Sequence, residues 1–175
     1  MKEQKTTGKI FLIAVSLIIF AALTRIIPHP FNFTAIAAMA LFSGVVFWDK
    51  KWAYILPFVA LFLTDLILGF HFSMIPVYAC VAFTLFMGIQ IKSKANLLVL
   101  GLTSLLSSIV FFLITNLPFW YADISLYPLT LEGTMTSYTM AIPFFKNQIL
   151  GDLFYTAVIF GTYSLATRKT KVSIA

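Results

Sequence analysis

The sequence predicts an all-α integral membrane protein, a bundle of six transmembrane helices, and three observations lead to this prediction. Hydrophobic residues make up 61% of the 175-residue chain and charged residues only 10%, whereas about half of a soluble domain is apolar. The apolar residues gather in six runs, each about as long as a helix that crosses a bilayer. The basic residues concentrate in alternate links between these runs, as in membrane proteins of defined orientation.

Each of the six apolar runs is predicted to be one membrane span. Their approximate bounds are residues 10–27, 31–48, 52–70, 74–91, 96–116 and 148–167. The links between them are short except for residues 117–147, which are predicted to form a long outer loop. Within this loop, residues 133–143 are apolar but too short to span, so a short helix or a re-entrant segment is expected there. The chain is therefore interpreted as a single transmembrane domain, residues 1–175.

The distribution of Lys and Arg predicts the orientation of the bundle. Ten of the twelve basic residues precede the first run, follow the sixth, or lie in the second–third and fourth–fifth links. Only Arg25 and Lys146 lie on the other side. Because positively charged links stay in the cytoplasm, both termini are predicted to be cytoplasmic. This rule also accounts for the net charge of +6, so nucleic acid is not an expected partner and the lipid bilayer is.

The N-terminal apolar run is interpreted as the first span and not as a signal peptide. It continues to Ile27 without a good cleavage site of the small-x-small type. The single cysteine, Cys80, allows no internal disulfide and lies in an apolar run, where a buried thiol is expected.

Three charged residues are predicted to lie at the same outer depth of the bundle. Asp65 is near the outer end of the third span, Asp152 is about one turn inside the sixth, and Arg25 ends the first. A carboxylate at the bilayer centre costs about 2.5–3.5 kcal/mol, so each acid should have a partner. A guanidinium suits carboxylates, and Arg25 is expected to pair with one or both of them. Such a pair either fixes helix packing or floors an outward-facing ligand pocket, and the two roles are compatible.

Polar and aromatic residues of the outer links are further candidates for ligand contacts. Asn32 is expected to cap the second span together with Thr34, behind an extended approach through Pro28 and Pro30. The aromatic residues of the long loop suit either an interfacial belt or stacking on a flat heterocycle. The predicted binding residues are Arg25, His29, Asn32, Asp65, Tyr127, Tyr138, Asn147 and Asp152.

Catalytic and metal-binding signatures are missing from the sequence. It contains no Gly-rich phosphate loop, GxSxG, HExxH or Walker motif. His29 and His71 lack the spacing of metal ligands and are interpreted as interfacial hydrogen-bonding groups. No catalytic residue, metal or cofactor is therefore predicted. Two alternatives to a binding or transport protein stay open: an enzyme at the outer face that uses the His and acidic residues, and a structural or assembly subunit without a small ligand.

Two parts of the sequence resemble known families. The stretch FTAIAAMALFSGVVFWDKKWAYILPFVALFLTDLILGF resembles the S components, the substrate-binding subunits of energy-coupling factor (ECF) transporters. PHPFNFTAIAAMALF together with YPLTLEGTMTSYTMAIPFFKNQILGDLFY resembles an uncharacterised family of small bacterial membrane proteins, which we place near the S components.

The resemblance to S components implies a function and a set of partners. It implies a protein of the bacterial inner membrane that binds a small vitamin-like nutrient in an outward-facing pocket, closed by outer loops, for uptake. It also implies an ECF coupling module, made of a transmembrane subunit and ATPases, as partner. The first span lacks the AxxxA pattern that commonly serves for docking to that module, since Ile18 stands four residues after Ala14. A solitary S-like protein, of the kind that handles cobalamin, is the alternative.

Overall fold

The computed structural model of the chain describes residues 8–168, and in this range all regular structure is helical. Four α-helices, α3 to α6, are long and apolar enough to cross a membrane, and α1 and α2 are shorter apolar helices. The all-α class is thus confirmed, together with the membrane character of the long helices. The elements are α1 (Gly8–Leu23), α2 (Ile36–Val46), α3 (Lys50–Leu68), α4 (Met74–Ile91), η1 (Lys92–Lys94), α5 (Leu97–Thr115), η2 (Pro118–Ile124) and α6 (Leu131–Arg168).

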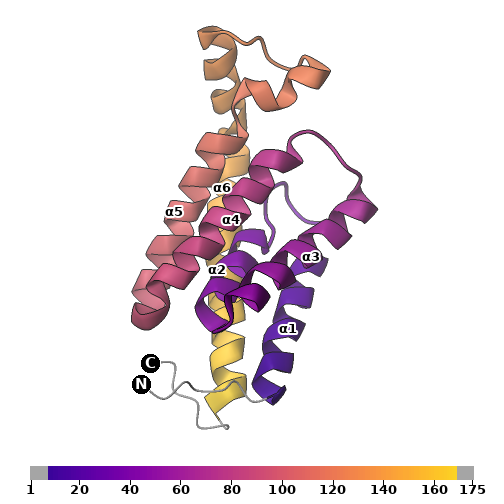
Figure 1. Ribbon diagram of the computed structural model, residues 1–175. Coiled ribbons are helices and arrows are strands. Elements are labelled where there is room, and N and C mark those ends of the chain that lie inside the picture. Colours follow the sequence, from indigo (N-terminus) through magenta and orange to yellow (C-terminus); the bar gives the residue numbers. More distant parts are fainter. Residues whose placement is uncertain (1–7, 169–175) are drawn as a thin grey trace.

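The short helix α2 lies at the centre of the bundle and contacts each of the other five α-helices (Figure 1). Its 11 residues extend only about 16 Å, which is less than the roughly 30 Å hydrocarbon core. The span predicted over residues 31–48 is therefore too long. Residues 31–35 belong instead to the α1–α2 link, and the helix ends where Phe47 takes an extended conformation.

Glycines allow α2 and α4 to pack with their backbones in contact. A Cβ atom on Gly88 would lie 2.6 Å from the Leu41 carbonyl oxygen, and one on Gly44 would overlap the Leu85 carbonyl oxygen. The small residues noted in the second apolar run thus serve close helix contact, as small residues do in membrane bundles. Ala40 lies on the buried face of α2 at this contact. The contact holds α4 in place beside the cavity between the helices.

A hydrogen bond from α2 compensates for a proline inside α3. Pro57 lies inside α3 and has no N–H group, so the Ala53 carbonyl loses its normal donor four residues later. The Ser43 hydroxyl of α2 donates to this Ala53 carbonyl at 2.7 Å. Both residues are buried, so the helix keeps its hydrogen bonding where no water could replace it.

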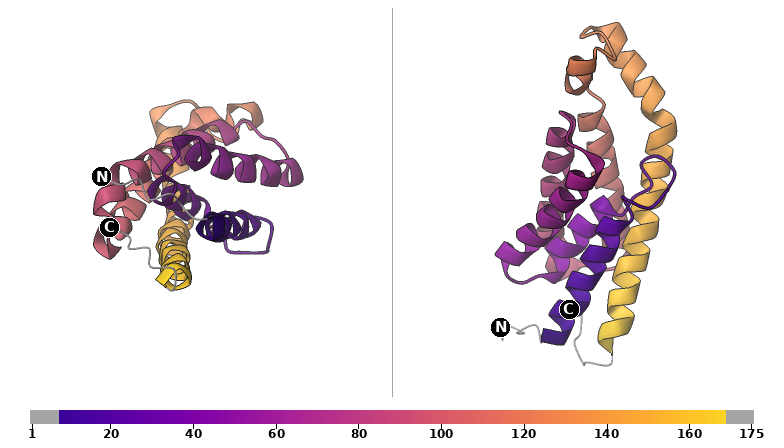
Figure 2. Two further views of the ribbon diagram at one scale, coloured as in Figure 1. Left: turned by 60° about the horizontal axis from the view of Figure 1, so that its bottom comes forward. Right: turned by 90° about the vertical axis from the view of Figure 1, so that its right-hand side faces the viewer.

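Helix α6 is continuous over 38 residues, or about 57 Å along its axis. It bends toward its N-terminal end (Figure 2, right). The long outer loop predicted over residues 117–147 is therefore wrong in its second half, because the helix already begins at Leu131. Thr136 and Thr139 donate their hydroxyls to carbonyls four residues earlier, which makes them compatible with a helix. Pro143 does not end the helix, as prolines are tolerated in long membrane helices.

The segment of residues 118–142, called the cap here, projects beyond the other helices (Figure 1). It consists of η2, the link that follows it and the first turns of α6. Trp120 Nε1 donates to the Ile114 carbonyl at 2.8 Å, and Ser137 donates to the Asn116 carbonyl at 2.7 Å. These bonds fasten the cap to the end of α5.

Candidate functional site

The predicted ion pair of Arg25 forms with Asp65. Arg25 Nη1 lies 2.6 Å from Asp65 Oδ1, and the same nitrogen donates to the Leu61 carbonyl oxygen at 3.3 Å. It also donates to the Thr64 hydroxyl. The Tyr78 hydroxyl of α4 donates to Asp65 Oδ2 at 2.7 Å. Because Asp65 is only 1% exposed, this arrangement neutralises a buried carboxylate and joins the end of α1 to α3 and α4.

Asp152 does not share this pair, contrary to one of the two predicted arrangements. It is 3% exposed, and its Oδ2 accepts a hydrogen bond from the Ser108 hydroxyl of α5 at 2.7 Å. Gln148, one turn earlier on α6, donates to the Ser108 carbonyl at 3.5 Å. Within the described part of the chain, no Lys, Arg or His nitrogen lies within 4.0 Å of the Asp152 carboxylate.

A cavity of about 580 Å³ lies between the α1–α2 link, the α3–α4 link and helices α2, α4, α5 and α6. Its polar lining residues are Arg25, His29, Asn32, Thr34, His71, Thr84, Ser107, Gln148 and Asp152. Its apolar lining residues are Phe31, Ile36, Ala37, Leu68, Val77, Cys80, Val81 and Phe111. Four of the residues predicted from the sequence to bind a ligand line this one cavity: Arg25, His29, Asn32 and Asp152. Asp65 does not line the cavity, but its ion pair with Arg25 holds that cavity residue in place.

The α1–α2 link, residues 24–35, forms one wall of the cavity. Thr24 closes its base, because its hydroxyl donates to the Ala21 carbonyl at 2.7 Å and accepts from the Ala35 N–H at 3.1 Å. Asn32 lies in a turn closed by the Phe33 N–H, which donates to the Pro30 carbonyl at 2.9 Å. Its φ of 61° is left-handed, a conformation that Asn tolerates better than most residues.

The capping role predicted for Asn32 and Thr34 is wrong. The N-cap residue of α2 is Ala35, whose side chain cannot cap, and the side chain that bonds to its N–H is Thr24 and neither Asn32 nor Thr34. The link is instead held by packing, since the Phe33 ring lies against the rings of Phe154 and Tyr155 on α6.

Three predicted contact residues lie away from the cavity. The Tyr127 ring meets the Tyr121 ring edge-on, and the Tyr138 ring packs on Phe112 while its hydroxyl donates to the Leu113 carbonyl. Asn147 is half-buried on α6 and does not line the cavity. The cap, which contains Tyr127 and Tyr138, is therefore not a lid over this cavity. Because α6 is continuous, the cap lies at the end of α5 instead.

The hydroxyl of Tyr121 in the cap is held as a hydrogen-bond donor. It donates to the Thr115 carbonyl at 3.0 Å. Burial raises the pKa of this phenol above its ordinary value, and the neighbouring Tyr127 adds to the increase. Tyr121 therefore stays protonated at neutral pH and serves to anchor the cap.

Sequence reasoning missed the polar stripe that α5 and α6 present to each other. Ser104 and Ser108 lie four residues apart on α5, and Asp152 and Thr156 lie four apart on α6. Thr156 donates to the Ser104 hydroxyl at 3.3 Å, which continues the contact made by Ser108 and Asp152. This spacing within apolar runs was the available signal, because residues four apart share one helix face. The buried Ser107 hydroxyl, also on the cavity wall, has no hydrogen-bond partner among residues 8–168.

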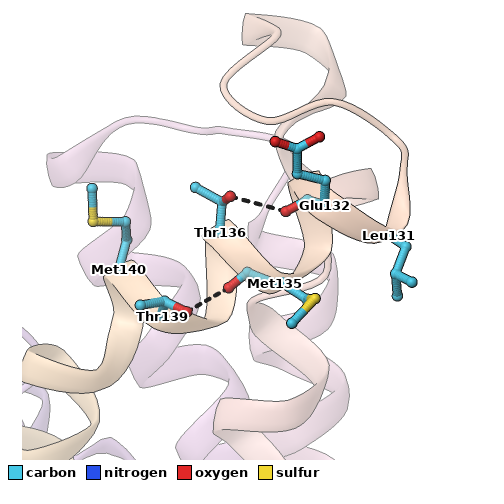
Figure 3. A pocket seen from close by; sticks show the side chains of 6 residues that line it. All are labelled: Leu131, Glu132, Met135, Thr136, Thr139 and Met140. Carbon is cyan, nitrogen blue, oxygen red and sulfur yellow. Dashed lines mark hydrogen bonds between the residues drawn. The ribbon is translucent and has the colours of Figure 1, made fainter.

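A second hollow, of about 500 Å³, lies on the surface of the cap (Figure 3). Its walls come from a single helix, the first turns of α6 between Leu131 and Met140. The bonds drawn there are local ones, from Thr136 to the Glu132 carbonyl and from Thr139 to the Met135 carbonyl (Figure 3). In the described part of the chain, no polar group of another element lines this hollow, so we do not treat it as a site.

The fold and the cavity together define an α-helical membrane protein with a polar cavity between its helices. Residues 5–173 match the model of a family of unknown function, DUF6580, and the chain belongs to this family. The expected membership in an uncharacterised family is thereby confirmed. No curated protein and no solved structure is detectably similar to the chain. Among residues 8–168, no three His, Cys, Asp or Glu side chains are grouped as a metal site would require.

Proposed function

We propose that this protein is a membrane-embedded substrate-binding protein of the ECF S-component type. It binds a small vitamin-like nutrient in the cavity beside the α1–α2 link and takes part in its uptake. It lies in the bacterial inner membrane with both termini in the cytoplasm, so that the cavity faces outward. The observation that carries the proposal is the cavity itself, which nine polar residues line in an otherwise apolar bundle.

The size and the chemistry of the cavity support a ligand of small-molecule size. Its volume of about 580 Å³ falls in the range of about 300–1,000 Å³ that is usual for ligand pockets. Ionisable groups within membrane helices are costly and mark ligand or ion sites. The fixed Arg25–Asp65 pair supplies a rigid frame, which a pocket needs if its contacts are to be specific.

The proposal includes the lipid bilayer and a small molecule as partners and leaves the ECF coupling module out. The described α1 helix has no pair of alanines four residues apart, because Ala14 is followed at that distance by Ile18. S components commonly dock to the shared module through such a pair, so the proposed protein works without that module.

Native mass spectrometry of the gently purified protein tests this proposal. We expect a co-bound small molecule in the wild type and its loss in Ala37→Phe, which places a ring in the cavity. Ala122→Phe, on the exposed surface of η2, is the matched control and should keep the molecule. If Ala37→Phe fails to fold, Thr34→Trp on the link replaces it. A molecule that both cavity variants retain, or a wild type that never carries one, would contradict the proposal.

A further inference from the structure

The charges around the cavity do not balance, and the imbalance indicates what kind of ligand it takes. We propose that the cavity binds an organic cation, a protonated amine or an amidinium, whose N–H groups bind Asp152 and Ser107. This inference rests on the proposed function and specifies the class of ligand at that same site.

The charge of Arg25 is already used by the protein. Its guanidinium is paired with Asp65 at 2.6 Å, so the two residues together contribute no net charge to the cavity. Asp152 is left as a buried carboxylate whose direct partner is the neutral Ser108 hydroxyl. An isolated buried carboxylate is costly, and a cation bound beside it removes that cost.

The two histidines of the cavity do not supply the missing positive charge. His29 Nδ1 is 2.8 Å from the Pro30 carbonyl oxygen, and His71 Nδ1 is 3.4 Å from the Gly69 carbonyl oxygen. Both side chains are exposed, and neither imidazole comes within 4.0 Å of Asp152. Within the described residues, Asp152 therefore has no basic side chain as a partner.

Ser107 provides an independent sign of a ligand at the same place. It is 2% exposed and lines the cavity, yet its hydroxyl has no hydrogen-bond partner within the described residues. Buried hydroxyls are almost always paired, so an orphaned one points to a missing partner. Ser107 is next to Ser108 on α5, and Ser108 bonds to Asp152. A carboxylate and a hydroxyl then offer two acceptors to one group with several N–H donors.

The remaining walls favour an organic body attached to the cationic nitrogen. Phe111, Val77 and Val81 line the cavity with apolar surface, and Phe31 adds a second aromatic ring. A bare metal ion would leave most of the volume of about 580 Å³ unfilled. An amine or amidinium on an apolar or aromatic body matches both the acceptors and the apolar walls.

Three probes of the same shape and different charge test the inference. Benzamidinium, benzamide and benzoate are added to the full-length protein in detergent, at constant ionic strength, and the unfolding temperature gives their dissociation constants. Benzamidinium should stabilise the wild type, and benzoate should not. Loss of a hydrogen bond to a charged group should weaken benzamidinium binding about tenfold or more in Asp152→Asn and several-fold in Ser107→Ala. Asp49→Asn, at the exposed start of α3, is the matched control and should bind like the wild type.

Several results would overturn the inference. They are equal binding of benzamide and benzamidinium, preference for benzoate, no stabilisation by benzamidinium, and unchanged benzamidinium binding in Asp152→Asn. A further contrary result has three parts: sodium chloride stabilises the wild type more than choline chloride does, Asp152→Asn loses this difference, and benzamidinium does not stabilise the protein. This result would show that Asp152 binds an inorganic cation. If Asp152→Asn does not fold, the charge series on the wild type and Ser107→Ala still decide. A neutral or anionic molecule found by native mass spectrometry would reject the organic cation and leave the proposed function standing.

Discussion

Asp65 and Asp152 are both buried carboxylates in apolar helices, but their surroundings differ. Asp65 has a guanidinium and a phenol as partners, whereas Asp152 has a hydroxyl. At the scale of the single residue, the first is a structural joint between α1, α3 and α4. The second lines a cavity without a basic partner among the described residues, and this difference separates a framework residue from a proposed binding residue.

Removal of Arg25 should destabilise the protein strongly. The substitution Arg25→Met leaves Asp65 buried without a counter-charge, so we expect a loss of about 3 kcal/mol in the free energy of unfolding. The double variant Arg25→Met/Asp65→Leu should lose less than the two single variants together, because it leaves no isolated charge. Unfolding in mixed micelles measures all three variants. Additive losses would show that the pair is not coupled.

Removal of the Ser43 hydroxyl should expose the defect that Pro57 creates in α3. Ser43→Ala leaves the buried Ala53 carbonyl without a donor, at an expected cost of about 1–3 kcal/mol in the free energy of unfolding. Pro57→Ala restores an N–H group at the right place, so Ser43→Ala/Pro57→Ala should be less affected than Ser43→Ala alone. The same micelle unfolding measures the difference. Equal losses in the single and double variants would contradict this explanation.

Residue chemistry was the part of the site that the sequence allowed us to predict. A charged side chain in an apolar run needs a partner wherever the run packs, so pairing of Arg25 with an acid followed from composition and depth. The choice of Asp65 over Asp152 did not follow, because it depends on how the α1–α2 link turns. Ser107 carries no charge and stands out only once the cavity is known.

At the scale of the element, α2 organises the bundle although it is too short to span. Eight of its 11 residues, Ala38 to Val45, are buried, and its glycine surface touches α4 backbone to backbone. Periodicity could not reveal this, because a helix that is apolar on all sides reads as a membrane span in either case. Its true limits are set by the turn at Asn32 and the extended Phe47.

The contact between α2 and α4 should not tolerate a single added methyl group. Gly44→Ala puts a Cβ atom into the Leu85 carbonyl, so we expect a loss of about 1–3 kcal/mol or more in stability from overpacking. Gly101→Ala, on α5, is the matched control, since a Cβ atom there meets nothing within 4 Å. It should be neutral or stabilising by up to about 1 kcal/mol, because Ala favours helix more than Gly. Equal effects of the two substitutions on the unfolding midpoint would disprove the close contact.

The same scale explains why the long outer loop was predicted wrongly. The threonines, Glu132 and Lys146 lower the apolar content of residues 131–147, so this stretch reads as a separate polar segment. In the structure the hydroxyls of Thr136 and Thr139 donate to carbonyls one turn earlier in the helix, and that of Thr134 donates to the Thr130 carbonyl just before it. They therefore continue α6 where a hydropathy pattern indicates an interruption.

At the scale of the whole molecule, the links divide into two groups that agree with the charge pattern. Lys92 of η1 donates to the Phe47 carbonyl at 2.7 Å, which places the two lysine-rich links side by side. Arg25 and Asp65 bring the opposite helix ends together beside the cavity. The positive-inside rule then predicts that the cavity and the cap face away from the cytoplasm.

Cysteine labelling in cells tests this orientation. Cys80 is buried and is first replaced by Ala, which gives a background without a thiol. Ser93→Cys then probes the exposed turn at η1, and Ala122→Cys probes the exposed surface of the cap. A maleimide that cannot cross the inner membrane should label Ala122→Cys in intact cells with a permeabilised outer membrane, and Ser93→Cys only after lysis. The physical reason is that Ser93 lies between Lys92 and Lys94, and the positive-inside rule predicts that such a link stays on the cytoplasmic side. The reverse pattern would place the cavity toward the cytoplasm and turn the proposed uptake protein into one that takes its ligand from inside.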